Sequence, residues 1–215
     1  MLTDDPGTVH QRNWEINTSI NTQINKFQEF EVPLIDINYG YNKRTQLKFE
    51  MPYVLSNEAS SNLTGMTGNP LLGIKYRFTN EGSGFVSVAA YPQVSIAIHE
   101  DERSEWKLPV EVEKNIGKFV LGDEIGFLNE ANGNFFFDGI LGGVKFTNKF
   151  EIMGEIYLIV TASALYPDRT MLNFGMRYEL KDKITVLCSL GTEVQNAEKE
   201  ERKSFFSFTG IQWAF

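Results

Sequence analysis

A hydrolase needs a general base, and the histidines available for that role in this chain of 215 residues are His10 and His99. His99 stands beside the acidic run 100–102 and close to Ser104. The members of a Ser–His–acid triad come from different parts of a fold, so neighbours in one polar stretch are weak support for a triad. We interpret His10 as part of a solvated tail and the His99 stretch as a solvated acidic loop. The alternatives for the loop are a site that bridges divalent cations or lipopolysaccharide, and catalysis.

Motifs for other chemistry are missing from the sequence. A single cysteine, Cys188, leaves no CxxC or Cys/His pattern, and neither a phosphate-binding glycine loop nor an HExxH motif occurs. The net charge is −8 and the pI is near 4.9, and no basic stripe offsets this acidity, so nucleic acid is excluded as a partner. We therefore predict no catalytic residue, no cofactor, no metal ion and a protein that is not an enzyme.

Polar residues that alternate with apolar ones are the stronger candidates for a function. In the segment 45–55, Gln46, Lys48 and Glu50 alternate with apolar residues, which is the period of a β-strand. We predict a lumen lined by Asp36, Asn38, Lys48, Glu50, Lys75, Arg77, Tyr91, Gln93, Lys107, Glu111, Glu155, Arg177 and Glu179. Two interpretations stay open: ion pairs that close the lumen, and a narrow pore or binding cavity lined by these groups.

The elements that must position these residues are strands, because the period of two recurs along the chain and helical periodicity is almost absent. We expect twelve, at about 14–25, 31–41, 45–55, 70–78, 84–95, 105–114, 118–128, 134–146, 150–162, 170–180, 184–194 and 203–215. Strands of about ten residues match a tilted bilayer crossing. Alternating short and longer connections predict a closed antiparallel transmembrane β-barrel of about 12 strands, with short periplasmic turns and longer extracellular loops. A large soluble barrel or sandwich is the alternative.

No domain boundary or repeat interrupts this series, so residues 1–215 are expected to form a single outer-membrane β-barrel domain. Residues 1–13 precede the first strand, and we expect an N-terminal periplasmic segment there. Met1 is not followed by the apolar core of a signal peptide, which leads us to expect the mature form of an exported protein.

Aromatic residues gather near both ends of the predicted strands. Trp14 and Phe150 are examples expected near the rim beside the short turns, and Tyr53 and Trp106 are examples expected near the opposite rim. Two aromatic belts are favoured at the two interfaces of a bilayer. The stretch 122–124 is an exception, because one of its two acids must face lipid unless a bulge shifts the register.

Five prolines lie inside predicted strands, where each removes a hydrogen-bond donor from the sheet. These are Pro33, Pro52, Pro70, Pro92 and Pro109, and the expected register places most of them at one level. Either the strands end at this level, or a kinked wall opens a path for an apolar solute. Both interpretations predict bulges there.

Several stretches resemble one family over most of the chain. The opening TDDPGTV (3–9), followed by 14–17, and the later blocks DINYGYNKRTQLKFEMPYVL (36–55), GIKYRF (73–78) and AAYPQVS (89–95) are similar to the phenol-degradation MetA-pathway family of outer-membrane transporters. The terminal FSFTGIQWAF resembles the last strand of outer-membrane barrels in general. This resemblance implies a bacterial outer-membrane location, a transport role, and an assembly signal that includes Trp213 and Phe215.

The leading functional hypothesis is a passive channel or transporter for small molecules, with aromatic or apolar ones favoured. A structural or adhesive barrel whose lumen is sealed by ion pairs is the second hypothesis, and a hydrolase at the rim is the third. The expected partners are outer-membrane lipids and lipopolysaccharide, the barrel-assembly machinery and a small-molecule solute.

Overall fold

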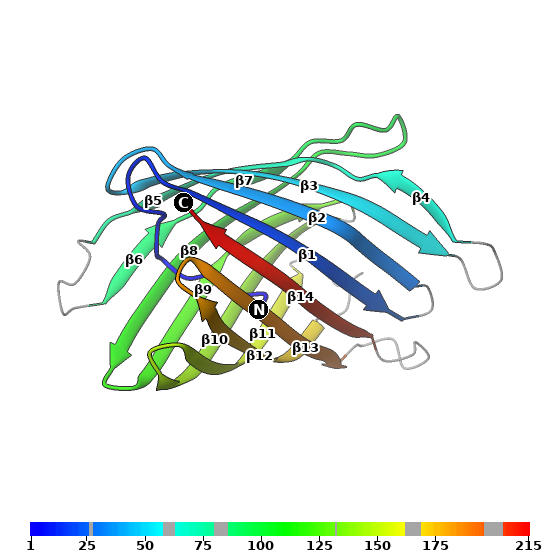
Figure 1. Cartoon of the computed structure of the whole chain (residues 1–215). Coiled ribbons are helices and arrows are strands. Elements are labelled where there is room, and N and C mark those ends of the chain that lie inside the picture. Colours follow the sequence, from blue (N-terminus) through cyan, green and yellow to red (C-terminus); the bar gives the residue numbers. More distant parts are fainter. Residues whose placement is uncertain (26–27, 58–62, 80–85, 132, 162–168, 196–203) are drawn as a thin grey trace.

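A computed structural model of the chain describes residues 1–25, 28–57, 63–79, 86–131, 133–161, 169–195 and 204–215 (Figure 1). These residues form fourteen strands. The strands are β1 (Trp14–Ile24), β2 (Gln28–Gly40), β3 (Thr45–Asn57), β4 (Thr64–Thr67), β5 (Leu71–Arg77), β6 (Ser87–Ala90), β7 (Gln93–Ser95), β8 (Glu105–Ile116), β9 (Phe119–Glu130), β10 (Gly133–Thr147), β11 (Phe150–Thr161), β12 (Arg169–Lys181), β13 (Ile184–Gln195) and β14 (Phe205–Ala214). Within the described ranges, no helix is long and apolar enough to cross a membrane.

The strands form one antiparallel sheet that closes on itself. The first and last strands pair along their length, with Ile16 opposite Trp213, and β3 pairs with β5 to complete the ring. β6 and β7 together occupy one position between β5 and β8, and β4 extends the sheet beside the far part of β3. The prediction of a twelve-strand antiparallel barrel is therefore confirmed, with two additional short strands. We call the end with the short connections and the C-terminus the turn end, and the opposite end the loop end (Figure 1).

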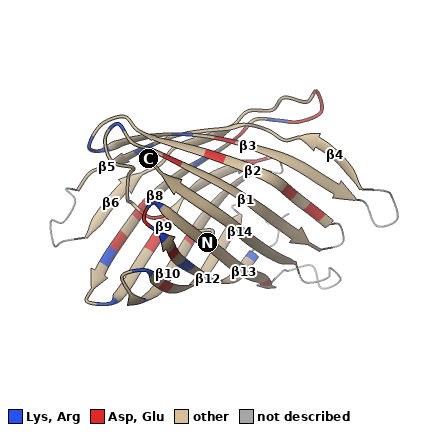
Figure 2. Ribbon diagram, in the orientation of Figure 1, with Lys and Arg blue, Asp and Glu red and all other residues tan. Residues whose placement is uncertain are grey.

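The two faces of the wall differ as the alternating pattern predicts. Outward positions are apolar and exposed: Ile74 retains 52% of its accessible surface, Ile140 58% and Phe174 68%. Charged residues occur within strands as well as in turns (Figure 2), and Lys75 and Glu111 lie buried on the inner face. A closed barrel with an apolar outer face satisfies its backbone hydrogen bonds internally, as a bilayer requires.

Aromatic rings meet at both ends of the wall. At the turn end the ring centroids of Trp14 and Tyr39 are 4.5 Å apart and those of Phe146 and Phe150 are 5.9 Å apart. Towards the loop end, Phe127 and Phe136 make an edge-to-face contact at 5.5 Å. These contacts place amphipathic or bulky rings near both rims, which is the arrangement expected for two bilayer interfaces.

The wall is irregular at the level of the prolines. The β2–β3 register shifts between Glu31 and Leu34, residues 68–70 separate β4 from β5, and residues 91–92 separate β6 from β7. The predicted interruptions are therefore present. β2, β3 and β8 nevertheless continue through their prolines, so strand ends account only for the part of the wall formed by β4 to β7.

Hydrogen bonds persist across this irregular part, because proline carbonyls still accept from the neighbouring strand. The pairs are Gly68 N–H to Pro52 O (2.9 Å), Ile96 N–H to Pro70 O (2.9 Å), Ile74 N–H to Pro92 O (3.1 Å) and Tyr91 N–H to Pro109 O (3.1 Å). The wall is thus kinked but remains connected at these points.

The acidic stretch in β9 is resolved without a bulge. β9 pairs with β8 and β10 in continuous register, so Glu124 points inward, where it is fully buried, and Asp123 points outward. Asp138 on β10 also points outward and lies close enough to Asp123 for the two carboxyl groups to interact electrostatically. Two acids therefore meet on the otherwise apolar outer surface.

Part of the inner face is apolar, which the alternating pattern did not indicate. Leu128, Phe135, Phe137, Tyr157 and Ile159 form a buried cluster inside the barrel, and Phe137 is fully buried. The rings of Phe137 and Tyr157 stack with centroids 5.7 Å apart. The lumen therefore has an apolar sector on β9 to β11 in addition to its charged sector.

Candidate functional site: the lumen

The N-terminal segment lies inside the barrel. Residues 1–13 were expected to form a periplasmic segment, but Thr3 is buried and the backbone of residues 2–9 bonds to side chains of the inner wall. Orphan backbone N–H groups need acceptors when they leave water, and inward carboxylates and amides of the wall supply them. The sequence interpretation assigned these acids to the wall alone and therefore missed the segment they hold.

Glu155 anchors the first part of this segment. Its two carboxylate oxygens accept hydrogen bonds from the backbone N–H groups of Leu2 (2.6 Å) and Thr3 (2.9 Å). The side-chain amide of Asn173, which is only 1% exposed, donates to the same carboxylate at 2.9 Å. Asn173 thus positions Glu155, a role that the alternating pattern did not indicate.

Lys75 connects the segment to the opposite part of the wall. Its ammonium group lies 3.3 Å from the carboxylate of Asp4 and 3.2 Å from that of Glu111, and it donates to the backbone carbonyl of Asp5. It also lies 4.4 Å from the centroid of the Tyr91 ring. Lys75 and Glu111 are almost inaccessible, at 3% and 0% of side-chain surface, so this ion pair is removed from bulk water.

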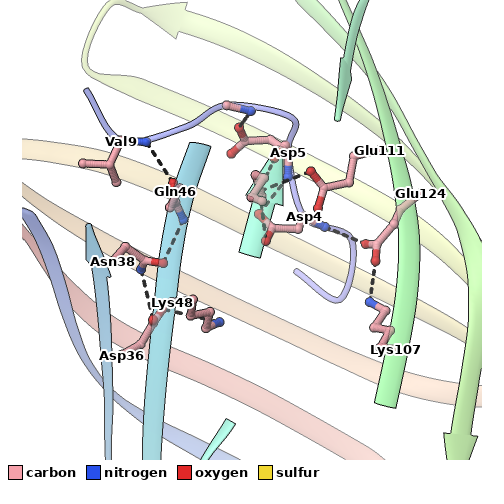
Figure 3. Close-up of polar contacts among 12 residues, drawn as sticks. Asp4, Asp5, Val9, Asp36, Asn38, Gln46, Lys48, Lys107, Glu111 and Glu124 are labelled. Atoms are coloured by element: carbon pink, nitrogen blue, oxygen red, sulfur yellow. Dashed lines mark hydrogen bonds and ion pairs between the residues drawn. The ribbon is translucent and has the colours of Figure 1, made fainter. Parts of the chain in front are cut away.

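Two further side chains of the wall, Glu124 and Gln46, hold the N-terminal segment (Figure 3). The buried carboxylate of Glu124 accepts from the Asp4 N–H at 2.8 Å and pairs with Lys107. Gln46 accepts from the Val9 N–H at 2.8 Å.

Gln46 continues a polar chain along β3 and β2 (Figure 3). It donates to Asn38 at 2.8 Å, Asn38 donates to Asp36 at 3.0 Å, and Lys48 lies 3.6 Å from Asp36 and 2.9 Å from Glu50. The charged groups are therefore linked into a network that extends from the wall to the N-terminal segment.

The ionisation of Asp4 favours this arrangement. Desolvation inside the barrel, where the Asp4 side chain keeps 43% of its accessible surface, would by itself raise the pKa of Asp4. The ammonium groups of Lys75 and Lys48 outweigh this effect and hold the pKa below its ordinary value. The Asp4 carboxylate therefore stays charged at neutral pH, where it can attract both lysines.

The structure brings most of the predicted lumen residues together. Those that contact the N-terminal segment or line an internal cavity are Asp36, Asn38, Lys48, Glu50, Lys75, Tyr91, Gln93, Lys107, Glu155 and Arg177. Glu111 is buried and pairs with Lys75. Arg77 lines a third hollow at the turn end and donates to the Lys43 carbonyl at 2.9 Å. Glu179 lines none of the three cavities. A role of these residues in passage of a solute stays a prediction.

Two cavities lie in series along the lumen. The loop-side cavity has a volume of about 540 Å³ and is lined by residues such as Glu31, Met171 and Phe206. The turn-side cavity has a volume of about 580 Å³ and is lined by residues such as Asp36 and Arg177. Leu2 borders both cavities, so the N-terminal segment lies at their junction.

The two histidines lie apart from this network. His99 Nε2 is 2.7 Å from the Thr67 carbonyl oxygen at the loop end, and His10 borders the hollow beside Arg44 at the turn end. In the part of the chain that the structure describes, no group of three or more His, Cys, Asp or Glu residues is placed to hold a metal ion.

Comparison with known proteins supports the architecture. No protein-family model and no curated protein sequence matches the chain, so the resemblance to the MetA-pathway family is not supported by a family match. Among solved structures, the COG4313 outer membrane channel from Pseudomonas putida F1 is 12% identical, has a TM-score of 0.72, and the match covers 97% of both chains. The NanC porin is 9% identical with a TM-score of 0.68, covering 92% of this chain and 98% of that one.

A third match is the KdgM porin in complex with disordered oligogalacturonate, which is 8% identical with a TM-score of 0.68 and covers 93% of this chain and 99% of that one. At these identities the likeness concerns the fold alone. The chain therefore has the fold of outer-membrane porin and channel barrels.

Proposed function

We propose that this protein is an outer-membrane channel for passive passage of small molecules, with apolar or aromatic solutes favoured. The observation that carries this proposal is the pair of cavities of about 540 and 580 Å³ separated by a segment that is held by polar contacts. A purely structural barrel of this size could fill its lumen with packed side chains. Here two cavities remain in the lumen, and a short stretch of chain lies at their junction.

The apolar sector of the lumen supports the preference for apolar or aromatic solutes. Leu128, Tyr157 and Ile159 belong to the buried cluster and also line the loop-side cavity. An apolar solute that reaches this surface leaves water, which favours its entry. In this proposal the protein is similar in role to the phenol-degradation MetA-pathway transporters that its sequence resembles.

The apolar outer face and the aromatic rims support a location in the bacterial outer membrane, in contact with lipid and lipopolysaccharide. The terminal strand, with Trp213 and Phe215, would present the signal to the barrel-assembly machinery. Phe215 is also tied to the first strand, because its backbone N–H donates to the Trp14 carbonyl at 2.9 Å.

A sealed structural barrel is the second candidate, and the buried Lys75–Glu111 pair favours it. Lys75 lies 3.2 Å from Glu111 of the wall and 3.3 Å from Asp4 of the N-terminal segment, so the same ammonium group holds the segment against the wall. The two candidates differ in whether the segment ever leaves its position.

Single-channel recordings in planar bilayers distinguish them. We expect the full chain to give small, infrequent openings, and a variant lacking residues 2–9 to give larger and sustained ones. Glu179→Gln, which changes an acid outside the cavities, serves as the matched control and should behave as the unmodified protein. Absence of current in both the full chain and the deletion variant, with the barrel folded, would refute the channel proposal and favour the sealed barrel.

A further inference from the structure

The loop-side cavity is large enough for a small organic molecule, and part of its wall is apolar. Its volume of about 540 Å³ lies in the range of ordinary ligand sites, roughly 300–1,000 Å³. Leu128, Ile159, Met171, Phe206 and Phe208 contribute apolar side chains to it. This wall can hold an aromatic ring or a short aliphatic chain, but it does not by itself select the charge of the solute.

The charges that border the cavity are unbalanced. Among the residues that the structure describes, five carboxylates line it, Glu29, Glu31, Glu105, Glu130 and Glu193, against the basic side chains of Lys107 and Arg169 and the terminal amino group of Met1. Both basic side chains already have acidic partners, because Lys107 pairs with Glu124 and Arg169 lies 3.4 Å from Glu130.

The hydrogen-bond donors to two of the other carboxylates are neutral. Glu31 accepts from the side-chain amide of Asn21 at 2.6 Å, and Glu105 accepts from the backbone N–H of Ala131 at 2.9 Å. A neutral donor satisfies an oxygen atom without cancelling the charge of the group. The cavity therefore presents a negative potential to a solute.

Two amide oxygens in the same cavity add an independent observation. Asn173 is 1% exposed, and its Nδ2 donates to Glu155, which fixes the orientation of the amide. Its Oδ1 has no hydrogen-bond partner among the residues that the structure describes, and the same holds for Oδ1 of Asn21, whose Nδ2 donates to Glu31. A buried acceptor without a donor is costly, so both atoms favour a ligand that brings donors.

We propose that the loop-side cavity binds organic cations in which a primary or secondary ammonium group is joined to an apolar or aromatic body. The ammonium group donates to the amide oxygen of Asn173 or to that of Asn21 and is attracted by the surrounding carboxylates, and the apolar body packs on the wall of Met171 and Phe206. Ammonium groups carry donors and no acceptor, which matches a site rich in acceptors. This inference rests on the proposed channel function and names the class of solute that the channel selects.

Three small molecules that share a ring and differ in charge test the proposal. Binding of benzylammonium, benzyl alcohol and benzoate to the full chain in detergent is measured at pH 7 by ligand-observed NMR. We expect benzylammonium to bind about tenfold more tightly than benzyl alcohol, because charge-assisted hydrogen bonds are roughly twice as strong as neutral ones. Benzoate should not bind measurably, and added salt should weaken only benzylammonium.

Matched variants locate the binding. Glu31→Gln keeps the shape of the side chain and should lower the affinity for benzylammonium several-fold while leaving benzyl alcohol unchanged. Asn21→Leu and Asn173→Leu should reduce the preference for the cation, and two positions are used because Asn173 also positions Glu155. Glu179→Gln lines no cavity and should leave all three affinities unchanged.

Equal binding of benzyl alcohol and benzylammonium would overturn the proposal, because the apolar wall would then act alone. A cation preference that survives Glu31→Gln and both asparagine variants would also overturn it, since binding would lie elsewhere. Single-channel currents from the same preparation separate this inference from the channel proposal. Currents without cation preference refute the inference and leave the channel, whereas selective ammonium binding without any current supports the inference and refutes the channel.

Discussion

Replacement of Lys75 by methionine removes the charge that joins the N-terminal segment to the wall. Lys75 lies 3.2 Å from Glu111 and 3.3 Å from Asp4, and its side chain retains only 3% of its accessible surface. Methionine keeps a similar length and an apolar stem, so packing along the stem changes little. The variant therefore isolates the effect of the buried charge.

The expected loss follows from the geometry. At 3.2 Å, two unit charges attract by about 5 kcal/mol at an effective dielectric constant near 20, before the cost of removing both from water. That cost cancels much of the attraction, but removing one partner leaves the other buried and uncompensated. Because Glu111 is fully buried, we expect the free energy of unfolding to fall by about 3–5 kcal/mol. The double variant Lys75→Met/Glu111→Gln should lose less than Lys75→Met alone, since no orphaned charge remains.

Urea unfolding of the barrel in lipid vesicles, followed by tryptophan fluorescence, measures these differences. Lys114→Met makes the same chemical change at an exposed position and should stay within about 0.5 kcal/mol of the unmodified protein. A loss below about 1 kcal/mol for Lys75→Met would show that water hydrates the pair. Equal losses for Lys75→Met and the double variant would show that Glu111 does not depend on Lys75.

Three further predictions use other parts of the barrel. Ile156 is 48% exposed on the outer face, so Ile156→Arg should reduce folding into vesicles at a cost of about 2–4 kcal/mol near the bilayer midplane, measured as the folded fraction on gels. Deletion of Phe215 should lower the amount of membrane-inserted protein in cells much more than it lowers the yield of folding into detergent. Equal reductions in the two assays would show that this residue only stabilises the fold. The folded-state pKa of Asp4 lies below its ordinary value, so the ionised carboxylate stabilises the closed segment fully at pH values above the ordinary pKa. This stabilisation is lost as the pH falls through the folded pKa. Single-channel conductance should therefore rise as the pH is lowered below the ordinary pKa of an aspartate, about 3.9, and Asp4→Asn should show higher conductance already at pH 7.

The barrel was predictable because each strand has one face toward lipid and the other toward the lumen. In β3 and β5, inward Lys48 and Lys75 alternate with outward apolar residues, and the period of two fixes both the element and its face. The same argument failed for the inner wall of β9 to β11. There, Phe135–Phe137 and Ile156–Ile159 are continuously apolar, which is the mark of strands apolar on both faces.

The N-terminal segment could not be predicted from alternation, because it is not a strand. Its position depends on Glu155, Glu124 and Lys75, which come from three strands and converge only when the barrel closes. Arg177 was predicted as a lumen residue, and its side chain is exposed to the turn-side cavity. Asn173, four residues earlier on the same face, is buried and holds Glu155, and an arginine there would disrupt that contact.

The uneven pairing of the wall gives the barrel a mechanical asymmetry. β9 and β10 pair over twelve residues without a shift, whereas β5 pairs with β6 over two residues and with β7 over three. Long continuous ladders resist bending, and short interrupted ones yield first. Under lateral pressure from the bilayer, the cross-section should therefore flatten on the β4 to β7 side, while the sector from β9 to β13 keeps its curvature. The stiffness of the barrel is therefore expected to differ around its circumference, with a rigid sector from β9 to β13 and a more deformable sector from β4 to β7.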